Sequence, residues 1–106
     1  MIFKRRFGEL IDRQLELFAQ DNAELFERAA DAEADYRAAG RDEAEERFGE
    51  LQDVLAEGTE ALVEVRETYA ETLEAEAAAE YQAAFDFAVL RRFPQFALEL
   101  EAEDDD

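Results

Sequence analysis

Residues 36–48 read YRAAGRDEAEERF, and this stretch predicts a turn between two helical segments. Gly40 follows Ala39 where the first segment would end, and glycine readily takes the left-handed conformation found just after helices. Asp42 is a suitable N-cap for the next helix, and Glu45, three residues later, would complete a capping box. We therefore expect the chain to reverse direction here.

The sequence on both sides of this turn favours helix. Ala, Glu, Leu and Arg dominate, and Pro94 is the only proline among 106 residues. We predict an all-α fold with a single helical domain over residues 1–100. Its architecture would be a long antiparallel hairpin, with helices at about 3–39 and 42–93 joined at Gly40-Arg41.

The first predicted helix has a seam with heptad periodicity, which favours a coiled-coil-like partner helix. The seam steps four and three residues in alternation through Ile11, Leu15, Phe18, Asn22, Leu25, Ala29, Ala32 and Tyr36. Asn22 has two interpretations. It caps a break after Asp21, or it is a polar seam residue in a continuous helix. The continuous helix is favoured, because the period crosses Asn22 without a phase shift.

The second predicted helix has one ambiguous point, at Gly58-Thr59. Gly58 could end a helix with Thr59 capping the next, which would split the hairpin into a three-helix bundle. Alternatively, Gly58 lies in register on the seam with Leu55 and Leu62 and permits close backbone approach, which we favour. The helix should end at about Phe93, because the residue before Pro94 is disfavoured in the α region.

In a simple hairpin, residues 81–93 would extend past the N-terminus by roughly 20 Å at 1.5 Å per residue. This overhang is rich in aromatic and aliphatic residues, and such a patch is rarely left exposed. A second copy, another protein, or a fold-back at Gly58 would cover it. The expected partners are therefore a sister subunit in a homodimer, another protein, or both.

The residue inventory excludes most enzyme chemistry. The chain has no His, Cys or Ser, and Lys4 is its only lysine. Ser–His and Cys–His nucleophiles and zinc sites built on Cys or His are impossible. The glycine spacing excludes a phosphate-binding loop. We expect no enzyme activity, no catalytic residues, no cofactor and no metal.

The net charge of −19, with a sequence pI near 4.1, disfavours direct nucleic-acid binding. It is compatible with adaptation to high salt, and it motivates an alternative function as an acidic nucleic-acid mimic that occupies a basic groove. No apolar run is long enough for a membrane span, so a cytoplasmic location is the expectation. Residues 101–106 read as an acidic disordered tail.

Aromatic and basic residues gather at both ends of the helical region, against the acidic pattern. These residues could form a partner-binding surface. The alternative interpretation is purely structural, because arginines near a helix C-terminus complement the helix dipole and phenylalanines often form core. Residues 95–101 alternate with a period of two, as in an extended docking segment or a loose terminal turn. The candidate partner-binding residues are Phe3, Arg5, Arg6, Phe7, Phe85, Phe87, Arg91, Arg92, Phe93, Phe96, Leu98 and Leu100.

Overall fold

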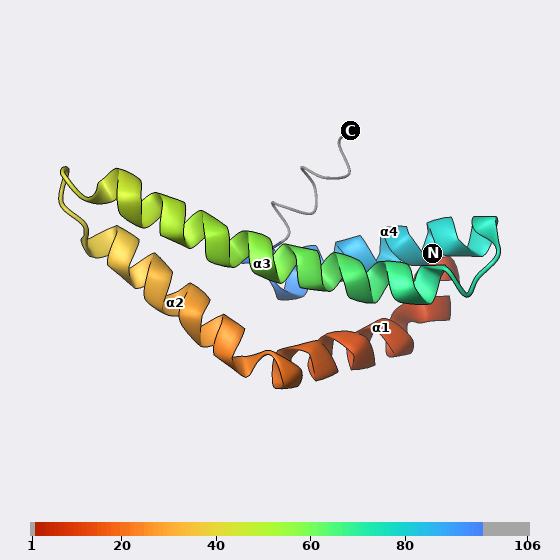
Figure 1. Cartoon of the computed structure of the whole chain (residues 1–106). Helices are drawn as coiled ribbons and strands as arrows, with labels where there is room; N and C mark the ends of the chain where they lie inside the picture. The colour runs from red at the N-terminus through yellow and green to blue at the C-terminus, as the bar shows by residue number, and fades with distance from the viewer. Residues whose placement is uncertain (1, 97–106) are drawn as a thin grey trace.

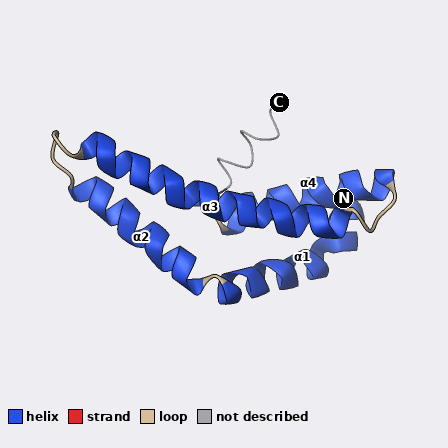
Figure 2. Cartoon of the chain, in the orientation of Figure 1, coloured by secondary structure: helices blue, strands red, loops and turns tan. Residues whose placement is uncertain are grey.

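The computed structural model describes residues 2–96, with side chains from Arg6 onward, and this part of the chain is all-α (Figures 1 and 2). It contains four long helices and no strand. They are α1 (Ile2–Asp21), α2 (Ala23–Ala38), α3 (Ala44–Ala70) and α4 (Ala75–Arg92). The all-α prediction is confirmed, whereas the simple hairpin gives way to a chain that also bends within its first half and folds back near its end.

The first reversal lies where residues 36–48 predicted it, between α2 and α3 (Figure 1). The predicted capping residues are wrong. Gly40 does not take a positive φ. The residue that follows α2, Ala39, has an extended backbone conformation. Glu43, not Asp42, precedes α3, and no side chain caps it. A backbone hydrogen bond from Glu43 N to Gly40 O, 3.0 Å long, closes the turn instead.

The predicted continuous helix through Asn22 is wrong, because the chain bends there between α1 and α2 (Figure 1). Asn22 leaves the helical region with φ −120° and ψ 34°. Its side-chain Nδ2 donates to the Phe18 carbonyl at 2.9 Å, beside the backbone bond from Asn22 N to the same oxygen. Competition of an asparagine side chain for nearby backbone groups favours such a break. The bend lets α1 pack mainly on α4, and α2 on α3.

The second predicted helix also divides, but at residues 71–74 and not at Gly58. Thr72 holds this turn, because both its backbone N and its Oγ1 donate to the Tyr69 carbonyl, at 2.9 and 2.7 Å. The chain then returns as α4, antiparallel to α3 (Figure 1). The predicted aromatic overhang is thereby folded back onto its own chain, and α4 ends at Arg92 just before Pro94, as expected.

The molecule is elongated, with principal extents of 50 × 30 × 22 Å. Its radius of gyration is 15.5 Å, compared with about 12–13 Å for a compact chain of this length. One end is a two-helix arm of α2 and the first half of α3. At the other end α4 packs on both α1 and α3, and it runs parallel to α1 and antiparallel to α3 (Figure 1).

An aromatic cluster of Phe18, Phe26, Phe93 and Phe96 joins the two ends of the molecule. Ring centroids of neighbouring members lie 5.1 to 6.5 Å apart. Phe96 is fully buried against Gly58, and Thr59 Oγ1 donates to the Phe96 carbonyl at 3.2 Å. The prediction that the helix continues through Gly58 is therefore confirmed, but the group that approaches Gly58 closely is the Phe96 ring and not another backbone.

Candidate partner-binding surface

Helix α4 has a buried inner face. Tyr81, Phe85 and Val89 have no exposed surface, and Ala84 is 7% exposed. These residues recur every three to four positions, so they form one side of the helix. They pack against α1 and the second half of α3 and fix the orientation of α4 in the bundle.

The opposite face of α4 is apolar as well as exposed. Between Ala77 and Leu90 the exposed residues are Ala79, Ala83, Phe87 and Leu90. The charged residues of this stretch, Glu80 and Asp86, are 31% and 29% exposed and are paired with arginines. Phe87 and Leu90 are each 41% exposed. The spacing of four, four and three residues places all four on one side of the helix. We call these four residues the α4 stripe, and it contrasts with the rest of a chain in which 39% of residues are charged.

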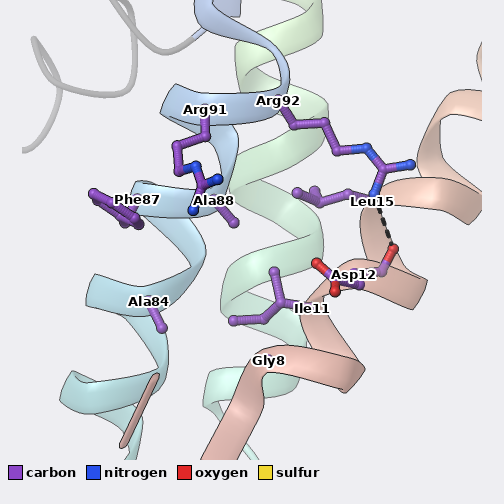
Figure 3. A pocket seen from close by; sticks show the side chains of 9 residues that line it. All are labelled: Gly8, Ile11, Asp12, Leu15, Ala84, Phe87, Ala88, Arg91 and Arg92. Carbon is purple, nitrogen blue, oxygen red and sulfur yellow. Dashed lines mark hydrogen bonds between the residues drawn. The ribbon is translucent and has the colours of Figure 1, made fainter. Parts of the chain in front are cut away.

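A groove of about 460 Å³ runs between α4 and α1, beside the α4 stripe (Figure 3). Small residues, Gly8 on α1 and Ala84 and Ala88 on α4, leave this space. Ile11 and Leu15 line it from α1. A methyl group added at Gly8 would meet no atom within 4 Å, so this end of the groove is open. The surface therefore combines an apolar ridge with an adjoining apolar hollow.

Arg91 and Arg92 close the C-terminal end of this surface. The Arg91 guanidinium lies over the Phe87 ring, 5.8 Å from its centroid. Arg92 Nη1 donates to the Asp12 carbonyl of α1 at 3.3 Å (Figure 3). Both arginines also lie in the last turn of α4, where positive charge complements the helix dipole. They have a structural role whether or not they contact a partner.

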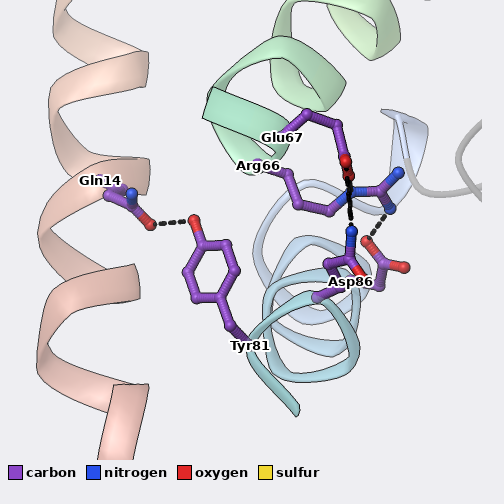
Figure 4. Close-up of polar contacts among 6 residues, drawn as sticks. Gln14, Arg66, Glu67, Tyr81 and Asp86 are labelled. Carbon is purple, nitrogen blue, oxygen red and sulfur yellow. Dashed lines mark hydrogen bonds and ion pairs between the residues drawn. The ribbon is translucent and has the colours of Figure 1, made fainter. Parts of the chain in front are cut away.

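A polar network holds the other side of α4 in place (Figure 4). The buried Arg66 of α3 donates to Asp86 Oδ1 at 2.7 Å and to Glu67 Oε2 at 2.8 Å. Gln82 Nε2 donates to the same Glu67 carboxylate. Because the charged groups are hydrogen-bonded, their burial carries a smaller penalty than isolated charges would.

Tyr81 links α4 to α1, because its hydroxyl donates to Gln14 Oε1 at 2.8 Å (Figure 4). Burial raises the pKa of Tyr81 to about 12, since the anion would lose its hydration. Every buried side-chain nitrogen and oxygen in the described residues has a hydrogen-bond partner. These features are typical of a structural core.

The structure separates the predicted candidate residues into groups. Phe7, Phe85, Phe93 and Phe96 are buried within the chain, each 8% exposed or less, because the turn at 71–74 folds α4 back over the core. Phe87, Arg91 and Arg92 lie together on α4. The side chains of Phe3 and Arg5, and residues Leu98 and Leu100, lie outside the described part of the structure.

The two basic ends do not form one surface, although the sequence placed both beside aromatic residues. Arg6 pairs with Glu80 at 3.6 Å, near the N-terminal ends of α1 and α4. Arg91 and Arg92 are about a dozen residues further along α4, which corresponds to roughly 18 Å at 1.5 Å per residue. The parallel arrangement of α1 and α4 causes this separation.

Sequence reasoning missed four surface residues: Gly8, Ala79, Ala83 and Leu90. The spacing of 79, 83, 87 and 90 was visible as a helical pattern. This pattern cannot be assigned to a separate face while the second helix is predicted to run unbroken to residue 93. Once residues 75–92 are treated as a separate helix, the two apolar faces of α4 can be distinguished.

A second long surface feature is acidic. Along the exposed side of α3, six carboxylates recur every three or four residues, at Glu46, Glu50, Asp53, Glu57, Glu60 and Glu64. We call them the acidic ridge. Arg47 pairs with Glu50 at 3.1 Å, and Arg28 pairs with Glu57. Repeated like charges on one helix face repel each other, so the ridge costs some stability.

Among the described side chains, no three Asp, Glu, His or Cys residues gather in a way that could hold a metal ion. None of the four helices is long and apolar enough to cross a membrane. Comparisons with protein-family models, with curated proteins and with solved structures find no match to this chain.

Proposed function

We propose that this chain is a non-catalytic helical assembly module that binds protein through the α4 stripe and the adjoining groove. The observation that carries the proposal is the row of exposed apolar residues on α4 between Ala77 and Leu90, where the two carboxylates, Glu80 and Asp86, are 31% and 29% exposed and are paired with Arg6 and Arg66. Elsewhere, exposed acidic residues follow one another along the helices. An apolar surface of this kind, bordered by polar residues, is typical of protein contact sites.

The composition of the surface supports contact with a helix in particular. Phe87 and Leu90 project as an exposed ridge, while Gly8, Ala84 and Ala88 leave a hollow beside them. Helices associate by packing ridges of side chains into such hollows. Arg91 at the end of the stripe supplies the residue type that is enriched, with aromatics, at protein interfaces.

Site-specific photo-crosslinking tests this proposal directly. A benzophenone amino acid replaces Ala83 in the α4 stripe, and the matched control replaces Gln52 on the exposed side of α3. The variants are expressed in the cells that make the protein and are irradiated there. We expect a protein adduct from position 83 and none from position 52. Equal adducts from both positions, or none from position 83, would contradict the proposal.

The acidic ridge favours a second candidate function, as a nucleic-acid mimic that occupies a basic groove on another protein. Six carboxylates along one side of α3 present a line of negative charge. The two ion pairs to Arg28 and Arg47 reduce that charge. Competition with duplex DNA for a basic DNA-binding protein at physiological salt tests this candidate, and no competition would rule it out.

A further inference from the structure

We propose that the occupant of the α4 stripe is a second copy of this chain, whose own α4 lies antiparallel about a twofold axis at the level of Ala84 and Phe85. This inference rests on the proposed function and names the partner for the same surface. A twofold contact uses the same patch on both copies, so the patch must complement itself. Size, charge and shape along α4 each meet that requirement.

The sizes of the side chains are complementary in this arrangement. The first half of the α4 stripe holds the two small residues, Ala79 and Ala83, and the second half holds the two large ones, Phe87 and Leu90. Antiparallel pairing places Ala83 opposite Phe87 of the second copy and Ala79 opposite Leu90. Large residues then pack against small ones along the whole contact. Parallel pairing would instead place large against large and leave a gap between the alanines.

The charges at the two ends of α4 are also complementary. Glu76 lies in the first turn of α4 and Arg91 and Arg92 lie in the last. The antiparallel arrangement brings Glu76 to the level of Arg91 and Arg92 of the second copy, at both ends of the contact. A parallel arrangement would juxtapose like charges. Charges at the edge of an interface mainly set orientation in this way, because exposed ion pairs add little affinity.

The net charge restricts where two copies can approach each other. Each copy carries −19, so they repel unless their contacting surfaces are free of acids. The acidic ridge covers the exposed side of α3, and acids recur along the exposed sides of α1 and α2. Within residues 77–90 of α4 the two carboxylates, Glu80 and Asp86, are only 31% and 29% exposed, and each is neutralised by an arginine, Arg6 and Arg66 respectively. The second copy therefore meets the least repulsion at the α4 stripe.

The groove provides space for the largest residue of the contact. Phe87 of the second copy lies at the level of Ala83 and Ala84, beside the end of the groove next to Gly8. That end is open enough for an added methyl group to meet no atom within 4 Å. The aromatic ring can lie in this hollow against Gly8, at the level of Ala84, above Ile11, which is itself buried.

A charge-exchange experiment tests the arrangement, with Glu76→Arg and Arg91→Glu as the two variants. Each variant alone places like charges at both ends of the contact, so its dimer dissociation constant should rise roughly tenfold. An equimolar mixture should recover association as a heterodimer, because each reversed charge then faces its opposite. Sedimentation of the separate and mixed samples measures this. Dimers that are equally strong in all three samples would overturn the antiparallel arrangement.

The absence of cysteine from the whole sequence allows a second, geometric test. Ala79→Cys and Leu90→Cys chains are mixed and oxidised, and the disulfide-linked products are identified by mass. We expect the mixed disulfide between positions 79 and 90 to predominate over both homodisulfides. Predominant homodisulfides would show parallel pairing and overturn the inference, while leaving the proposed function in place.

A wild-type chain that stays monomeric at all concentrations would also overturn the inference. In that case, photo-crosslinking from position 83 tests the proposed function separately. Capture of a different protein from that position would leave the function intact with a different partner. If no protein is crosslinked from position 83, both the inference and the proposed function are contradicted.

Discussion

The ring of Phe96 lies against the backbone of Gly58 near the middle of α3. A Cβ at Gly58 would lie 2.7 Å from Phe96 Cζ and 2.8 Å from its Cδ1. The ring cannot move aside easily, because it is fully buried and packs on Phe26 and Phe93. This contact fixes the end of α4 on α3, and so it positions the α4 stripe.

We predict that Gly58→Ala lowers the free energy of unfolding by about 1–2 kcal/mol, as overpacking of a core does. The control is Gly49→Ala on the same helix, where an added Cβ would meet nothing within 4 Å. That change should raise the free energy of unfolding by about 0.5–1 kcal/mol, because alanine favours helix over glycine. Urea unfolding measures the free energy of unfolding of both variants. An increase in this free energy for both substitutions would contradict the contact between Gly58 and Phe96.

The bend at Asn22 gives a second prediction. Asn22→Ala removes the side-chain hydrogen bond to the Phe18 carbonyl and should cost about 0.5–1.5 kcal/mol. Alanine is the better helix former, so a straight helix through residue 22 would gain stability from the same change. Thermal unfolding monitored by circular dichroism shows whether Asn22→Ala lowers or raises the stability of the chain. A stabilised Asn22→Ala variant would show that the bend is not maintained by this side chain.

Tyr81 gives a prediction about alkaline pH. Its pKa is about 12 in the folded chain and near 10.0 when the ring is exposed to water. The folded state therefore favours the protonated form, and its stabilising effect is complete below pH 10. Between pH 10 and about 12 the unfolded chain releases the proton first, so stability falls by up to about 1.4 kcal/mol per pH unit.

Tyr81→Phe is the control for this pH dependence. It loses the hydrogen bond to Gln14, which should cost about 1 kcal/mol at neutral pH. It also lacks the titrating group, so the wild type should lose its advantage over the variant as the pH approaches 12. Urea unfolding at several pH values tests this. Parallel stability curves for the two chains across this range would contradict the buried, protonated tyrosine.

The acidic ridge predicts that salt stabilises the chain. Molar NaCl shortens the screening length to about 3 Å, so repulsion among the six carboxylates should weaken and the Tm should rise. Glu60→Lys places a positive charge three or four residues from Glu57 and Glu64. It should raise the free energy of unfolding by roughly 0.5–1 kcal/mol at low salt, with a smaller gain at high salt. A gain that is independent of salt would exclude screening as its cause.

The sequence predicted the features of the fold that local chemistry determines. The position of the turn after residue 38 was predicted, although Gly40 does not act as the left-handed cap expected of it, and the end of α4 before Pro94 follows from proline. The role of Gly58 as a close contact followed from its position on the seam. The turn at residues 71–74 could not be found in this way, because it contains neither glycine nor proline and depends on hydrogen bonds from Thr72. The aromatic residues after Tyr81 indicated that something must cover them, but the sequence left open a second copy, another protein or a fold-back at Gly58.

The candidate surface was predicted less well than the fold. Most of the candidate phenylalanines are core, because a phenylalanine near Arg91 looks the same in sequence whether it faces inward or outward. Only the helix phase distinguishes Phe85, which is buried, from Phe87, which is 41% exposed. That phase could be assigned only after the limits of α4 were known.

Sedimentation equilibrium of the wild type beside two charge-insertion variants tests the central claim most directly. Leu90→Glu places a carboxylate in the α4 stripe, and Leu17→Glu places one on the exposed side of α1, where Leu17 is 49% exposed. We expect a dimer for the wild type and for Leu17→Glu, and a monomer for Leu90→Glu, with equal helix content in all three. A monomeric wild type, or a Leu90→Glu chain that dimerises as strongly as the wild type, would contradict assembly through α4.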